Sequence, residues 1–249
     1  MNDEAINSEQ AKGEPKKTSP AKAPKKPYVA GSDHAGRPVI YNLTRAFFLA
    51  YFKLGGVKVY GRENIPRSGR FIFAPNHVSH LDPPLVSIYA PRRPHAVSKS
   101  ELFENPVVAF LYSGLGAFPI QRGRADRKAI RRAIEILEHD EPLLIFPEGT
   151  RSKTGEFGPP EIGLGMIAHA AKAPILPVYV KGTQNCLSPV RPGVRFTKTE
   201  LHFGRPLLFE EEYARRGDRA TLEAINARVM EEMRALRATA NMDTLGGAR

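Results

Sequence analysis

A histidine and an aspartate five residues apart are the strongest chemical signal in the sequence. Both belong to Asn-His-Val-Ser-His-Leu-Asp, residues 76–82, here named the His77 turn, and two prolines follow. Proline suits the first turn of a helix, so we expect a helix to begin there with Asp82 as its N-cap. The chain would bend through residues 78–81 and bring the Asp82 carboxylate back to the His77 ring. A carboxylate that orients an imidazole forms a general base.

The nucleophile for such a base is expected to come from outside the chain. A protein serine nucleophile would stand on a strained turn of the G-x-S-x-G type, and the sequence has none. We therefore predict that His77 deprotonates a hydroxyl of the substrate. The alternative is a purely structural role, in which Asp82 only caps a helix and His77 is an ordinary loop histidine. A metal site of His77, His80 and Asp82 is weaker still, because no spaced partner completes it.

A second polar cluster follows an apolar segment, residues 143–146. It is Phe-Pro-Glu-Gly-Thr-Arg-Ser, residues 146–152, here named the Glu148 loop. Gly149 permits a left-handed backbone, and the Arg151 guanidinium has the planar fork that suits phosphate. The structural alternative is an ion pair between Glu148 and Arg151 within a turn.

Further cations follow other expected strands. Arg122 and Arg124 come after residues 117–120, and Lys99 comes after the preceding expected strand, residues 95–98. If these strands share one sheet edge, the cations lie together, and an anionic ligand explains them. A solvated basic rim is the alternative.

The elements that must position these residues alternate between short apolar runs and amphipathic helices. This pattern predicts an α/β fold with a mostly parallel central sheet flanked by helices, which binds ligands at the carboxyl ends of its strands. We expect strands at 57–60, 70–74, 95–98, 117–120, 143–146, 175–180 and 200–203. We expect helices at 83–88, 101–113, 127–139, 162–171 and 221–240.

The first 56 residues have a different composition. Residues 1–27 are rich in Lys and Pro and predict a disordered basic tail, which is either a membrane tether or a leader without a role. Residues 28–56 are expected to form an interfacial membrane-binding segment, because 39–54 is apolar and aromatic but contains Arg45 and Lys53. A core helix is the alternative. Residues 57–249 would form the catalytic domain.

Composition limits the class of protein. The chain has 249 residues, a formal net charge of +11 and one cysteine, Cys186. An internal disulfide and a cysteine-rich zinc site are therefore excluded. No run of about 18 apolar residues predicts a spanning helix, and the acidic start does not predict a secretory signal. The positive charge suits an anionic membrane, a nucleic acid or a phosphorylated ligand.

Taken together, the motifs resemble those of the glycerolipid acyltransferase family, which includes the lysophosphatidic acid acyltransferases. The likeness spans about residues 40–210. The family pattern N-H-x-x-x-x-D is matched by Asn76, His77 and Asp82, with the usual serine at Ser79, and F-P-E-G-T-R-S is complete. The pattern G-x-x-F-I-x-R is matched at Gly116, Ile120 and Arg122, and an apolar strand around Pro177 matches the fourth block.

The resemblance implies acyl transfer to the sn-2 hydroxyl of lysophosphatidic acid in phospholipid biosynthesis. His77 would be the base and Asp82 its orienting partner. Substrate binding is implied for Asn76, Ser79, Arg122, Glu148, Gly149, Thr150, Arg151 and Pro177. The expected co-substrate is acyl-CoA or acyl-carrier protein, with no metal and no further cofactor. The protein is expected to bind an anionic membrane surface as a peripheral protein on the cytoplasmic face of the inner (plasma) membrane.

Two departures from the family pattern bear on substrate fit. Pro119 replaces an aromatic residue, and Gly-Pro-Pro-Glu at 158–161 lacks the lysine often found there. Another acceptor, such as glycerol-3-phosphate, a lyso-ornithine lipid or another lysophospholipid, therefore stays open. A non-catalytic basic protein that binds membrane or nucleic acid is the alternative class. No nucleic-acid-binding motif supports the latter, so we expect no nucleic-acid partner.

Overall fold

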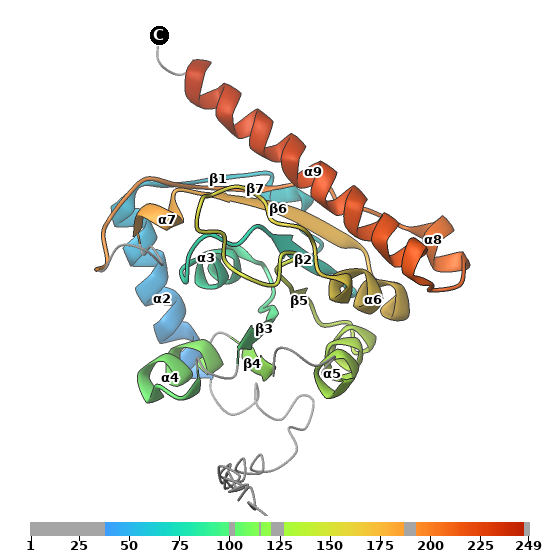
Figure 1. Ribbon diagram of the computed structural model, residues 1–249. Helices are drawn as coiled ribbons and strands as arrows, with labels where there is room; N and C mark the ends of the chain where they lie inside the picture. Colours follow the sequence, from blue (N-terminus) through green and yellow to red (C-terminus); the bar gives the residue numbers. More distant parts are fainter. Residues whose placement is uncertain (1–37, 100–102, 115, 121–126, 187–192, 247–249) are drawn as a thin grey trace, which may run out of the picture.

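A seven-stranded sheet forms the centre of the protein, in a computed structural model that describes residues 38–99, 103–114, 116–120, 127–186 and 193–246. The strand order is β1-β7-β6-β2-β5-β3-β4, and every neighbouring pair is parallel except β6 and β7. The expected α/β class with a mostly parallel sheet is thus confirmed (Figure 1). The strands are β1 Val57–Tyr60, β2 Ile72–Pro75, β3 His95–Lys99, β4 Ala117–Ile120, β5 Leu143–Leu144, β6 Ile175–Lys181 and β7 Thr199–Phe203.

Helices cover both faces of this sheet (Figure 1). One core cluster joins α2 and α3 to the sheet, and a second joins α5, α6 and α9 to its other face. The strands show why: Phe73 belongs to the first cluster, whereas its neighbours Ile72 and Ala74 belong to the second. The helices are α2 Pro38–Gly55, η1 Arg62–Asn64, α3 Asp82–Tyr89, α4 Pro106–Gly114, α5 Arg127–Glu138, α6 Ile162–Ala171, α7 Thr183–Cys186, α8 Glu210–Ala214 and α9 Arg219–Gly246.

The observed elements differ from the expected ones mainly at their ends. β5 is limited to Leu143–Leu144, because the chain turns at Phe146 into the Glu148 loop. α4 begins at Pro106, where the proline fits the first turn, and not at residue 101. η1, α7 and α8 were not expected. α9 runs on to Gly246, and its C-terminal part extends beyond the body of the molecule (Figure 1).

The helix α2 has two apolar faces, only one of which is covered. Phe48, Tyr51 and Phe52 are buried and belong to the first core cluster. Along the other face, large apolar side chains are exposed at helical spacing: Val39, Leu43, Phe47 and Leu54. The alternative interpretation of this segment, a helix that packs in the core, is therefore correct for one face of α2. Among the described residues, no helix is both long and apolar enough to cross a bilayer.

Candidate active site

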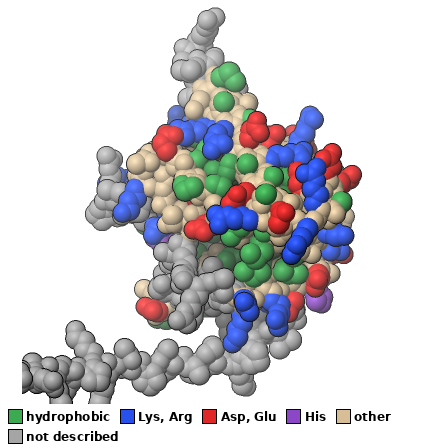
Figure 2. Space-filling view, turned by 45° about the vertical axis from the view of Figure 1, so that its right-hand side comes forward, with side chains coloured by type: hydrophobic (Ala, Val, Ile, Leu, Met, Phe, Trp, Pro, Cys, Tyr) green, Lys and Arg blue, Asp and Glu red, His purple; other side chains and the backbone are tan. Residues whose placement is uncertain are grey.

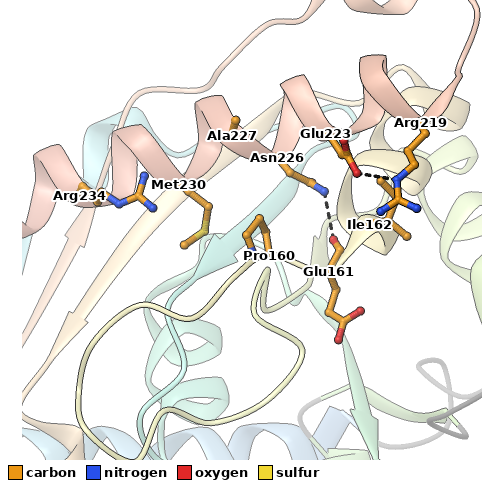
Figure 3. A pocket seen from close by; sticks show the side chains of 9 residues that line it. All are labelled: Pro160, Glu161, Ile162, Arg219, Glu223, Asn226, Ala227, Met230 and Arg234. Carbon is orange, nitrogen blue, oxygen red and sulfur yellow. Dashed lines mark hydrogen bonds and ion pairs between the residues drawn. The ribbon is translucent and has the colours of Figure 1, made fainter.

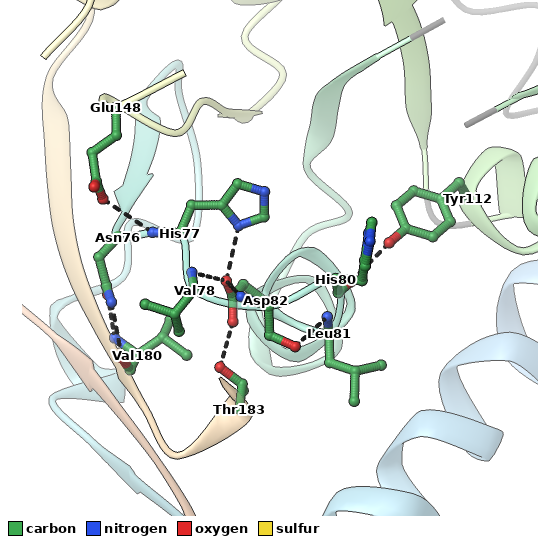
Figure 4. A network of polar contacts seen from close by, with 11 residues as sticks. Asn76, His77, Val78, His80, Leu81, Asp82, Tyr112, Glu148, Val180 and Thr183 are labelled. Atoms are coloured by element: carbon green, nitrogen blue, oxygen red, sulfur yellow. Dashed lines mark hydrogen bonds and ion pairs between the residues drawn. The ribbon is translucent and has the colours of Figure 1, made fainter. Parts of the chain in front are cut away.

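The His77 turn lies where β2 ends and α3 begins, at the carboxyl end of a strand in the middle of the sheet. The predicted bend is present, and His77 Nδ1 lies 2.9 Å from Asp82 Oδ2. The same oxygen accepts hydrogen bonds from the backbone N–H groups of Val78 and Ser79, both at 2.7 Å. The carboxylate is fully buried, and these donors compensate for the loss of its hydration (Figure 4).

Asp82 does not cap α3, which corrects the expectation drawn from the sequence. The N-cap position is Leu81, and Asp82 is the first residue of the helix. A capping side chain accepts from N–H groups further along its helix, whereas this carboxylate accepts from residues before it. The reversed direction aims the carboxylate at the His77 ring and excludes the reading of Asp82 as only a cap.

In the part of the chain that the structure describes, two contacts hold the His77 ring, and its second nitrogen has no hydrogen-bond partner. The Phe146 ring stacks on it with 3.9 Å between centroids and 25° between planes. With Nδ1 donating its proton to Asp82, Nε2 carries the lone pair, and it points away from the carboxylate (Figure 4). The ring side chain is 14% exposed, so a substrate hydroxyl can reach it. This arrangement fits a general base.

The Glu148 loop is joined directly to the His77 turn. Glu148 accepts hydrogen bonds from the backbone N–H of His77 at 3.2 Å and of Gly158 at 2.7 Å, and Ser152 N–H donates to the His77 carbonyl at 2.7 Å. Burial raises the pKa of Glu148, and the two backbone donors partly oppose this. Glu148 therefore bridges the loops, which speaks against an isolated ion pair with Arg151.

The other residues of the Glu148 loop leave room for a ligand to approach the backbone. Gly149 has a φ of +61°, and a side chain there would meet the Glu161 side chain. Thr150 is exposed at the tip of the turn. Arg151 Nη1 is shielded from solvent and has no hydrogen-bond partner among the described residues. A buried guanidinium N–H without a partner is suited to receive an anionic oxygen.

The other expected site residues are spread over the strand ends. Asn76 clamps β2 to β6, because its side-chain amide donates to the Val180 carbonyl and accepts from the Val180 N–H. Ser79 Oγ accepts from Leu81 N–H at 3.2 Å and stabilises the turn. Pro177 is buried within β6 beside Gly204, and it pairs with Ala74 of β2, three residues before His77. Arg122 lies outside the described residues.

Three neighbours of the pair were missed by the sequence analysis. Phe146 stacks on His77, and Thr183 Oγ1 donates to Asp82 Oδ1 at 2.5 Å. Tyr112 of α4 donates to the His80 carbonyl at 2.7 Å, and burial raises the pKa of its hydroxyl. Phe146 is the last residue of the apolar segment and the first of the Glu148 loop, so its place beside a site residue could have been inferred from the sequence. Nothing in the sequence pairs Thr183 or Tyr112 with the turn.

A cleft of about 470 Å³ lies between residues 160–162 and α9 (Figure 3), and none of its lining residues belongs to the His77 turn. Asn226 donates to the Glu161 carbonyl, and Arg219 pairs with Glu223 across its rim. The cleft contains no histidine and so does not house the base. Within the described part of the chain, no group of three or more His, Cys, Asp or Glu side chains could hold a metal ion.

Comparison with known proteins shows which family the chain resembles. Residues 56–181 match the Acyltransferase family, and the match ends two residues before Thr183. A 1-acyl-sn-glycerol-3-phosphate acyltransferase of Bacillus subtilis is 32% identical over 182 residues, which cover 71% of this chain and 88% of that protein. A chloroplast enzyme of the same name from Brassica napus is 29% identical, over 55% of this chain and 40% of its own length.

A solved structure has the same fold. The 1-acyl-sn-glycerophosphate (LPA) acyltransferase PlsC from Thermotoga maritima superposes with a TM-score of 0.65 and is 27% identical in sequence. The likeness covers 80% of this chain and 79% of that one.

Proposed function

The chain belongs to the acyltransferase family, and we propose that it transfers a fatty acyl group from a thioester to the sn-2 hydroxyl of lysophosphatidic acid, which gives phosphatidic acid. The observation that carries the proposal is the His77–Asp82 pair beside the Glu148 loop, in which His77 Nε2 has no hydrogen-bond partner among the described residues. The names of the Bacillus and Thermotoga relatives support the acceptor.

The chemistry follows from a base without a protein nucleophile. His77 Nε2 takes the proton of the acceptor hydroxyl as its oxygen attacks the thioester carbonyl carbon. A C–O bond forms, the tetrahedral intermediate collapses, and the C–S bond breaks. The proton passes from His77 to the departing thiolate. The buried Asp82 carboxylate stabilises the imidazolium between these two steps.

Binding of the acceptor phosphate rests on arginine. Arg151 follows Glu148 by three residues, and its Nη1 lacks a hydrogen-bond partner among the described residues. A phosphate oxygen there would provide one. The resemblance adds Arg122, and it assigns acyl-CoA or acyl-carrier protein as the donor. The bond changes consume only the acceptor and the thioester, so we propose no further cofactor.

A second acceptor chemistry has one observation in its favour. The side chain of Glu161 packs against Gly149, at the turn of the Glu148 loop, and its carboxylate has no ion pair among the described residues. A carboxylate there would favour an acceptor with an ammonium group, such as a lyso-ornithine lipid. A lyso-ornithine lipid is therefore one of the acceptors in the acyl-transfer assay described below.

We also propose that the enzyme docks on an anionic membrane through α2. The stripe of Val39, Leu43, Phe47 and Leu54 is exposed, and α4, which packs on α2, exposes Val107 and Phe110. Exposed apolar side chains that line up in this way mark an interaction surface. Because the acceptor and product are lipids, a bilayer is the partner that fits.

A loop at the C-terminal end of α2 extends this apolar surface. Val194 and Phe196 are exposed, and the Phe196 ring lies 5.0 Å from the ring of Tyr51 on α2. Lys53, Arg195 and Lys198 are exposed close by in the chain and suit anionic lipid headgroups. The side of the molecule that carries α6, α8 and α9 is different, because cations and carboxylates alternate there (Figure 2). We place the enzyme peripherally on the cytoplasmic face of the inner membrane, where the proposed donors occur.

An acyl-transfer assay on purified protein with lipid vesicles tests the function. The acceptors are lysophosphatidic acid, glycerol-3-phosphate and a lyso-ornithine lipid, each with acyl-CoA and with acyl-carrier protein. His77→Ala removes the base, and His139→Ala, at an exposed histidine directly after α5, is the matched control. We expect phosphatidic acid from the wild type and the control but not from His77→Ala. Equal turnover by His77→Ala would refute the mechanism, and transfer only to another acceptor would refute the substrate.

A further inference from the structure

The second oxygen of the Asp82 carboxylate has its own partner. Asp82 Oδ2 serves His77 and two backbone N–H groups, whereas Oδ1 accepts from the Thr183 hydroxyl at 2.5 Å. Asp82 and Thr183 are both fully buried. Among the described residues, this hydroxyl is the one hydrogen-bond donor to Oδ1.

Thr183 is brought to this place by the end of β6. The strand ends at Lys181, and Gly182 turns the chain with a φ of +91° into α7, which begins at Thr183. A side chain on Gly182 would lie 2.3 Å from the Lys198 carbonyl, so glycine is required at this turn. Figure 4 shows the Thr183 hydroxyl directed at Asp82 from the side opposite His77.

The turn at Gly182 is also held at a fixed distance from the His77 turn. Asn76, directly before His77, makes two hydrogen bonds with Val180, three residues before Thr183. These hydrogen bonds therefore fix the position of the Thr183 hydroxyl relative to His77, although Asp82 and Thr183 are 101 positions apart in the chain.

We propose that Thr183 is a positioning residue of the base: its hydroxyl fixes the rotation of the Asp82 carboxylate, so that Oδ2 stays on His77 Nδ1. A carboxylate held at only one oxygen can turn about its terminal torsion, which is broad and twofold. Turning would weaken the hydrogen bond that keeps the proton on Nδ1 and the lone pair on Nε2. This inference rests on the proposed function for its kinetic consequence but not for its geometry.

Two substitutions separate the hydroxyl from the shape of the side chain. Thr183→Val is nearly isosteric and removes the donor, whereas Thr183→Ser keeps it. Thr199→Val is the matched control, because Thr199 is equally buried and its hydroxyl has no hydrogen-bond partner among the described residues. For Thr183→Val we expect kcat to fall about tenfold with KM for the acceptor unchanged, as for one lost hydrogen bond to a charged group. Thr183→Ser and Thr199→Val should keep the wild-type kcat.

A second readout does not depend on activity. In protein labelled with ¹⁵N-histidine, the ring nitrogen shifts report which nitrogen carries the proton, and His77→Ala identifies the signal. Thr183→Val should shift the His77 ring away from the Nδ1–H tautomer, while Thr199→Val should not. Wild-type tautomer and wild-type kcat in Thr183→Val would overturn the inference. Absence of transfer by the wild type would overturn the proposed function instead, and the tautomer measurement would still decide the role of Thr183.

Discussion

At the residue scale, Asp82 shows how much a sequence reveals about a site. The spacing of His77 and Asp82 and the prolines after them predicted the bend that brings them together. The donors that hold the carboxylate were not predictable in the same way. Two of them are backbone groups, and Thr183 lies 101 residues away, so its contact depends on the pairing of β6 with β2.

Asp82→Asn tests the charge while it keeps the hydrogen bonds. The amide oxygen can face His77 and the two backbone donors, and the amide NH₂ can donate to the Thr183 hydroxyl, which can also accept. We expect the fold to persist and kcat to fall about a hundredfold, because the imidazolium loses its counter-charge. Urea unfolding and steady-state kinetics measure both effects. Wild-type kcat in a folded Asp82→Asn protein would contradict the assigned role.

Glu148 makes stability depend on pH in a predictable direction. Burial raises its pKa above the ordinary 4.5, so between 4.5 and the raised value the native state holds more protons than the unfolded state. The free energy of unfolding therefore falls as pH rises through this window. Glu148→Gln should lose this decrease, whereas Glu231→Gln on the exposed side of α9 should keep it. Urea unfolding at a series of pH values measures the slope, and equal slopes in the wild type and Glu148→Gln would disprove the assignment.

At the element scale, α2 explains why the sequence left two interpretations open. A run that is apolar all round is compatible with a core and with a membrane interface, and here each face takes one of these environments. Deleting residues 1–54 would remove Phe48 and Phe52 from the core, so it would not test membrane binding cleanly. The length of β5 was overestimated for a related reason. Apolar residues continue through Phe146, but the strand has ended before it, and the Phe146 ring packs on His77.

The absence of tryptophan from the chain allows a clean test of the α2 surface. Phe47→Trp and Phe196→Trp each place one fluorophore on the proposed membrane face. On vesicles with anionic lipid we expect a blue shift and quenching by brominated acyl chains, because an indole settles at the bilayer interface. Leu208→Trp, which is exposed near α9, is the control and should show neither effect. Identical spectra with and without vesicles for Phe47→Trp would disprove docking through α2.

At the scale of the whole molecule, α9 reaches the site although it lies far from it in the chain. Arg237 makes two hydrogen bonds with the Glu156 carboxylate and lies 5.4 Å from the Phe157 ring centre. The next residue, Gly158, donates to Glu148, which in turn accepts from the His77 backbone. The C-terminal helix therefore supports the segment that joins the Glu148 loop to α6.

Charge reversal tests whether this support matters for turnover. Arg237→Glu places two carboxylates together and should loosen residues 153–158, and we expect kcat/KM for the acceptor to fall about threefold, the scale of an exposed ion pair. The double variant Arg237→Glu/Glu156→Arg restores opposite charges and should recover most of the loss. Arg215→Glu, which breaks the exposed pair with Glu211 at α8, should leave kcat/KM unchanged. If the double variant were no better than Arg237→Glu alone, the effect would come from the arginine guanidinium over the Phe157 ring and not from the ion pair, and α9 would act on the base through this cation–π contact.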